Sequence, residues 1–163
     1  TVLTPWRVVN MHIGDCIGGQ VFYEEDMQTE GLKPRLIDHG EVTAKVFKDP
    51  DTRILEINSK TGLYPLFMAY SVFAEKLQAY RDTHMLATDI PVSIQNEIWD
   101  KVLRDNIFIV CKTEIEALTL ENNLIKLHSP SVWGPLLNQY RHIFIHLYFA
   151  PCLRKSFCLV MLN

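Results

Sequence analysis

The stretch RILEINSKTGLYPLFMAYSVFAEKLQAY, residues 53–80, constrains the fold of this chain more than any other. An apolar run, RILEI, comes first, and a short polar segment with one glycine, Gly62, follows it. Such a compact run is typical of a strand buried in a parallel sheet. Between Pro65 and Tyr80, apolar side chains recur at spacings of three and four, which predicts a helix with one apolar face. Pro65 suits the first turn of that helix, because its missing N–H costs nothing there.

The remaining pattern adds elements on both sides of this unit. Upstream we predict strands at residues 6–13 and 20–26, a loop at 27–35, and a short strand that passes into a helix at 36–47. Downstream we predict a helix at 94–105, a buried strand at 106–112 and a helix at 113–128. The order strand, helix, helix, strand, helix predicts an α/β domain with a mainly parallel sheet, flanking helices and a right-handed crossover.

The last 35 residues differ in kind from the rest. Residues 129–163 hold Arg and Lys but neither Asp nor Glu, and their apolar runs have no clear period. The run HIFIHLYFAPCL, which contains no Lys, Arg, Asp or Glu, is too short to span a bilayer. We therefore divide the chain into a domain at 1–128 and an unassigned apolar tail at 129–163. Because the chain begins with Thr1, we expect it to be a piece of a longer protein.

Charge and cysteine usage exclude several classes of function. The net charge is −3, so the chain lacks the basic footprint that binding to nucleic acid without sequence preference requires. The four cysteines form no C-x-x-C pair, which argues against a zinc site. Scattered cysteines without a signal peptide favour reduced thiols, and we expect a cytoplasmic protein without a membrane anchor.

Glu56 stands inside the apolar run, where a carboxylate is costly unless it has a partner. Either a basic side chain at the end of the sheet or a cationic ligand would meet that cost. A strand that ends in a turn and opens a helix forms a binding crevice at the carboxyl edge of the sheet. The single glycine, Gly62, argues against a pyrophosphate site, whose loops need more glycine. An adenosyl cofactor fits this pattern better.

The string ILEINSKTGLYPL resembles motif I of the S-adenosylmethionine-dependent DNA adenine methyltransferases. Together with WRVVNMHIGDCIGGQVFYEED and GEVTAKVF, it resembles more closely a restriction–modification subgroup of that family, over about residues 6–112. The resemblance implies a Rossmann-like methyltransferase fold, here incomplete, and S-adenosylmethionine as the cofactor. By position it implies that the cofactor is lined by Glu56, Asn58, Thr61 and Gly62, with Glu114 nearest to the place of the acid that binds the ribose.

The chain lacks the [DNS]-P-P-[YF] string with which these methyltransferases hold and stack the flipped adenine. The implied function is therefore the cofactor-binding part of a DNA adenine-N6 methyltransferase, with the catalytic residues outside this chain. We expect DNA contacts through other parts of the enzyme, and restriction–modification subunits as possible partners.

A second string, FIVCKTEIEALTLENNLIKLHSP at residues 108–130, resembles the GIY-YIG nuclease domain of the DNA repair excinuclease. That resemblance implies that Glu121 is a ligand of one Mg²⁺ ion. The tyrosine-bearing hairpin of that family is missing, and Trp133 stands where an asparagine is expected. The plainer interpretation of Glu121 is an exposed helix carboxylate. A nuclease fragment and a non-catalytic remnant are thus the alternatives to the methyltransferase, and two families meeting in one chain suggest a mosaic.

Overall fold

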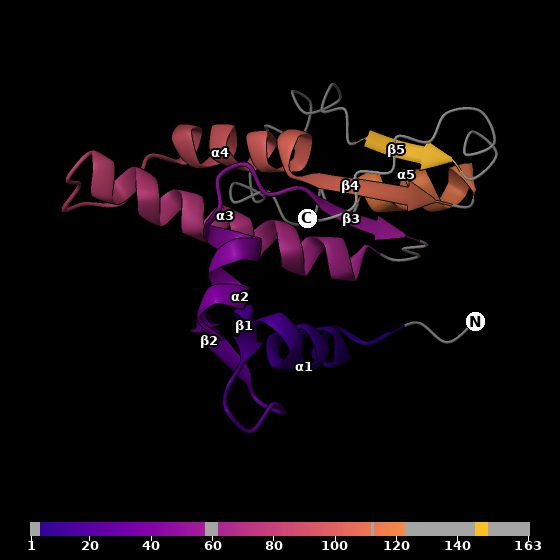
Figure 1. The fold of residues 1–163 in the computed structure, drawn as a ribbon, viewed down its shortest axis with the longest axis horizontal. Helices are drawn as coiled ribbons and strands as arrows, with labels where there is room; N and C mark the ends of the chain where they lie inside the picture. Colours follow the sequence, from indigo (N-terminus) through magenta and orange to yellow (C-terminus); the bar gives the residue numbers. More distant parts are fainter. Residues whose placement is uncertain (1–3, 58–61, 112, 123–145, 150–163) are drawn as a thin grey trace.

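The structure is a computed structural model that describes residues 4–57, 62–111, 113–122 and 146–149 (Figure 1). The N-terminal part holds α1 (Trp6–Ile17), β1 (Gly19–Tyr23), β2 (Glu30–Ile37), the short α2 (Glu41–Thr43) and a π-helical turn, η1 (Ala44–Lys48). The remainder holds β3 (Ile54–Ile57), α3 (Leu63–Thr83), α4 (Val92–Asp105), β4 (Ile107–Cys111), α5 (Glu114–Asn122) and β5 (His146–Phe149). The chain is therefore a mixed α/β protein.

The predicted parallel sheet is present as three strands in the order β3-β4-β5. Both pairs are parallel, with Ile54 opposite Ile107 and Phe108 opposite His146. Two helices, α3 and α4, connect β3 to β4, which confirms the predicted order strand, helix, helix, strand. Strand β5 comes from the tail that the sequence pattern left unassigned, so at least this part of the tail pairs with the domain.

Two predictions for the N-terminal part are wrong. Residues 6–13 belong to helix α1 and form no strand, because the residues that this helix buries, Val9, Asn10 and Gly14, recur at helical spacing. The predicted loop at 27–35 is largely strand β2, which pairs antiparallel with β1. Pro34 is tolerated because the register of the pair shifts between Val21 and Tyr23, at a bulge.

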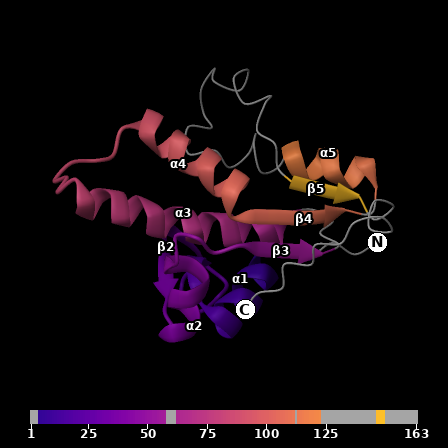
Figure 2. The ribbon, with the colours of Figure 1, turned by 45° about the horizontal axis from the view of Figure 1, so that its top comes forward.

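Helix α3 is the element around which the two parts are arranged (Figure 2). It contacts α1 and β1 on one side and β3, β4 and α4 on the other. Phe67 and Ser71 face the N-terminal part, where a Cβ added to Gly19 would lie 3.0 Å and 2.8 Å from their side chains. Phe73 meets Trp99 of α4 edge to face, with ring centroids 5.4 Å apart. Helix α3 thus contributes side chains to the core on both of its sides.

Buried polar side chains fix α1 and α3 to strand β1. The amide of Asn10, which is fully buried, accepts a hydrogen bond from Phe22 N at 2.9 Å and donates one to Trp6 O at 2.8 Å. Ser71 Oγ accepts a hydrogen bond from Gln20 N at 2.9 Å. These bonds satisfy backbone groups of β1 on the side away from β2.

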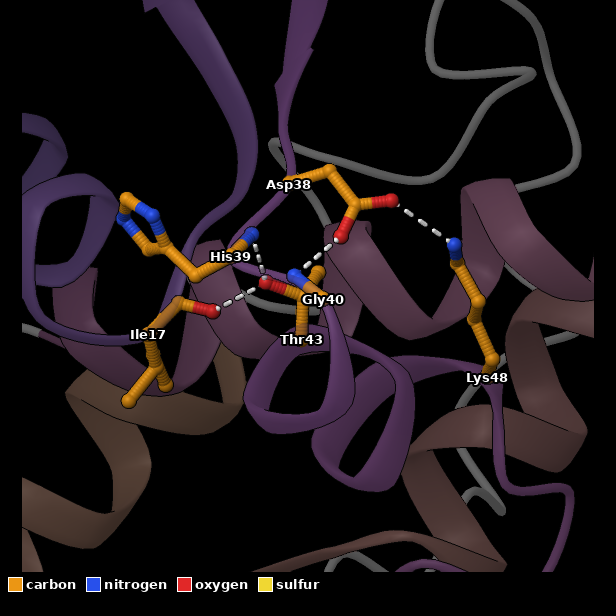
Figure 3. Close-up of polar contacts among 6 residues, drawn as sticks. All are labelled: Ile17, Asp38, His39, Gly40, Thr43 and Lys48. Carbon is orange, nitrogen blue, oxygen red and sulfur yellow. Dashed lines mark hydrogen bonds and ion pairs between the residues drawn. The ribbon is translucent and has the colours of Figure 1, made fainter.

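The junction between α1, β2 and α2 is a polar corner (Figure 3). The Thr43 hydroxyl donates to Ile17 O and accepts from His39 N, each at 2.8 Å. Asp38 accepts from Gly40 N at 2.8 Å and pairs with Lys48 at 2.9 Å. Because these groups bond to one another, the corner is explained as structure and requires no ligand.

We expect Asn10→Ala to lower the free energy of unfolding by about 1–3 kcal/mol, because Phe22 N–H loses its acceptor. Chemical denaturation measures this change. Gln78→Ala is the control: it removes an exposed amide that bonds to Asp82, and should change stability by about 0.5 kcal/mol or less. Equal effects of the two substitutions would contradict the role given to Asn10.

Candidate cofactor site

The carboxyl edge of the parallel sheet is the place where the sequence predicts a ligand. Strands β3 and β4 run parallel, so their ends, Ile57 and Cys111, lie at the same edge. Helix α3 begins directly after Gly62, five positions beyond the end of β3. The edge therefore combines a strand end with a helix N-terminus, which is the arrangement that binds ligands in open α/β sheets.

Glu56 lies in β3, one residue before the end of the strand, and its side chain is half-buried. It pairs in register with Ile109 of β4, an apolar neighbour. Among the residues that the structure describes, no side chain or backbone group hydrogen-bonds to its carboxylate, and no Lys, Arg or His forms an ion pair with it. Burial raises the pKa of Glu56. The basic partner that the sequence left open as an alternative is thus not found within the described part.

The N-terminus of α3 has backbone N–H groups that a ligand could bond to. Gly62 is its N-cap in the left-handed conformation, φ 80° and ψ 9°, and no side chain of the described residues caps the helix. The first turn contains no acidic residue. The backbone N–H groups at such a terminus carry partial positive charge and attract anionic groups. Pro65, as predicted, stands in this first turn.

Leu120 of α5 packs over the Gly62 turn. A Cβ added to Gly62 would collide with the Leu120 side chain, which is fully buried. Two structural features therefore require glycine at position 62: its positive φ and the close contact with Leu120. A ligand at this edge has to approach from the side that Leu120 leaves free.

Helix α5 begins with a capping box. Glu116 N donates to Thr113 Oγ1 at 3.2 Å, and Thr113 N donates to Glu116 Oε2 at 3.3 Å. The capping box thus hydrogen-bonds backbone N–H groups at the N-terminus of α5, in contrast to that of α3. Glu114 is the first residue of α5, and Glu121 lies near its end. Both stay predictions as site residues, because the structure describes only their backbone.

Two of the predicted cofactor residues, Asn58 and Thr61, lie outside the described residues. Lys112, which follows β4, lies outside them as well. The structure therefore brings Glu56 and Gly62 to the same edge and leaves the positions between them untested.

Sequence reasoning missed a pair at the start of α3. Tyr64 in the first turn shares a hydrogen bond of 3.0 Å with Nδ1 of His12 on α1, and their rings meet edge to face at 5.8 Å. His12 is exposed and Tyr64 half-buried. No short-range signal predicts this pair, because its members stand far apart in the sequence and His12 was assigned to a strand.

In the described part of the chain, no group of three or more His, Cys, Asp or Glu is placed to hold a metal ion. No helix among the same residues has the length and hydropathy needed to cross a bilayer. No protein-family model, curated protein or solved structure matches the chain. The two resemblances therefore stay predictions from the strings that carry them.

We expect Gly62→Ala to cost about 2–4 kcal/mol, the sum of left-handed strain and overpacking against Leu120. Chemical denaturation of a double-mutant cycle separates the two causes. In a Leu120→Ala background the same change should cost only about 1–2 kcal/mol, since the clash is gone and the strain remains. An equal cost in both backgrounds would show that the Leu120 contact contributes nothing.

We expect Glu56→Gln to stabilise the protein by about 2 °C in Tm at pH 7.5, because it removes an unpaired, half-buried charge. The pKa of Glu56 is raised in the folded state, so folding is favoured by the protonated form. The stabilising contribution of protonated Glu56 is complete below the pKa that Glu56 has in the unfolded state. It is lost as the pH rises through the pKa that Glu56 has in the folded state.

The gain in Tm should therefore shrink as the pH falls towards 4.5, and thermal scans over this range measure it. Glu25→Gln, at an exposed position in the loop after β1, is the control and should leave Tm unchanged. A lower Tm for Glu56→Gln at pH 7.5 would mean that the carboxylate has a stabilising partner.

Proposed function

We propose that this chain is the cofactor-binding part of an S-adenosylmethionine-dependent DNA adenine-N6 methyltransferase of a restriction–modification system, built on a Rossmann-like sheet. One observation carries the proposal. Glu56 is a half-buried carboxylate without a partner in the described structure, at the carboxyl edge of a parallel sheet, next to a turn that opens a helix. Structural carboxylates at such depth normally have a partner.

The chemistry of S-adenosylmethionine matches this edge. Its sulfonium and ammonium groups are cations, and a half-buried carboxylate attracts a cation more strongly than an exposed one, because water screens it less. Its carboxylate is an anion of the kind that the N-terminus of α3, which has no side-chain cap among the described residues, favours. In the proposal, Glu56 binds a cationic group and the backbone of the Gly62–Tyr64 turn binds the anionic one.

The proposal assigns no methyl transfer to this chain alone. Transfer to an adenine amine needs an acceptor for its hydrogens and an aromatic platform for the base, and the sequence lacks the [DNS]-P-P-[YF] string that supplies them. The net charge of −3 also fits a part of an enzyme whose DNA contacts lie elsewhere. We place the protein in the cytoplasm, where its DNA substrate would be found.

Calorimetric titration of the full chain with S-adenosylmethionine tests the proposal. We expect a Kd on the order of 10 µM and a loss of at least roughly tenfold in Glu56→Gln, equivalent to about 1.4 kcal/mol. The control Glu25→Gln should bind as the unchanged chain does. Since Glu56→Gln is expected to fold more stably, a loss of binding in this variant cannot be attributed to unfolding.

Two outcomes would contradict the proposal. The first is the absence of binding by the unchanged, folded chain. The second is binding that Glu56→Gln leaves intact. A Mg²⁺-dependent cleavage of DNA that Glu121→Gln abolishes would instead favour the nuclease, for which the helical conformation of residues 114–122 is the supporting observation.

A further inference from the structure

Helix α4 carries buried polar atoms that have no hydrogen-bond partner among the residues that the structure describes. They are Asn96 Oδ1, Trp99 Nε1 and Asp100 Oδ1. The spacing of three and four residues places them on one face of the helix. Asn96 is 7% exposed and Trp99 is 1% exposed. Buried polar groups are almost always paired, so a cluster of this kind on one helix face requires an explanation of its own.

Within the described residues, the elements packed against α4 provide no countercharge for Asp100. Strand β4 contains no acidic or basic residue, and Lys76 of α3 interacts with Lys101 and Asp105 of α4 instead. On α4 itself, Arg104 favours the charged carboxylate and Glu97 opposes it. Burial, supported by Glu97, outweighs the effect of Arg104 and raises the pKa of Asp100 to about 6.

We infer that Asn96 and Asp100 form a proton-binding pair on the buried face of α4. When Asp100 takes up a proton from solvent, its carboxyl group gains a donor that reaches Asn96 Oδ1 across one turn of the helix. A single proton then satisfies two acceptors. When Asp100 is ionised, both oxygens remain without a donor in a medium of low dielectric constant. Nothing in the described structure explains the missing partner of Trp99 Nε1.

The pair makes the docking of α4 depend on pH. The pKa of Asp100 is raised in the folded state, so its stabilising contribution is complete below the unfolded value near 4. That contribution is lost as the pH rises through about 6. Helix α4 packs against α3 and β4, and it should therefore be held more firmly in mildly acidic solution than at pH 7.5.

Carboxyl NMR titration and chemical denaturation of the full chain between pH 4.5 and 8 test the inference. We expect the Asp100 carboxyl signal, assigned by its absence in Asp100→Asn, to titrate near pH 6. The unfolding constant of the unchanged chain should rise about 25-fold over this range relative to Asp100→Asn, which mimics the protonated form. Asp105→Asn, an exposed carboxylate on the same helix, should leave that rise in place.

A second variant separates the pair from burial alone. In Asn96→Ala the protonated carboxyl group loses its acceptor and water enters, so the midpoint of Asp100 should fall by about one pH unit. An Asp100 midpoint near 4 in the unchanged chain would overturn the inference and would indicate that ordered water satisfies these atoms. A midpoint near 6 that Asn96→Ala leaves unchanged would overturn the pairing as well.

Discussion

The burial of helix α3 on two sides is the interaction on which the rest of this structure depends. One side, with Phe67 and Ser71, receives the N-terminal hairpin at Gly19, where no Cβ fits. The other side, with Phe73, receives Trp99 and the parallel sheet. Neither the two-stranded hairpin nor the small parallel sheet has enough apolar surface to be stable alone. Both become stable because they share one helix, which also sets where the turn at Gly62 lies.

The candidate site shows a conflict between stability and function. The fold gives the buried amide of Asn10 and the hydroxyl groups of Thr43 and Ser71 hydrogen-bond partners from other elements, yet it leaves Glu56 without one in the described part. A structural role would be served as well or better by an apolar residue in β3. Residues that cost stability at a strand end beside a helix N-terminus are the ones for which a ligand provides the compensation.

The sequence predicts the parallel unit well and the N-terminal part poorly. The runs RILEI and NIFIVCK are short, apolar and followed or preceded by helical periodicity, so local pattern decides their structure. Residues 6–17 contain β-branched residues as well as helical spacing, and only packing against β1 and α3 selects the helix. The pattern predicts Glu56 and Gly62 as site residues, and the structure places both at the same edge of the sheet. The contact of Leu120 with the turn, and the His12–Tyr64 pair, depend on long-range packing that no local pattern contains.

The topology also determines the order in which the chain can reach its native state. The hairpin β1–β2 joins neighbours in sequence and closes a short loop, so it can form early. The parallel pair β3–β4 joins position 54 to position 107, and we expect it to form more slowly because it closes a long loop. The turn that carries the candidate site is therefore completed late, when β4 and then Leu120 reach it, and a ribosome-bound chain that ends before α5 would present an unfinished edge.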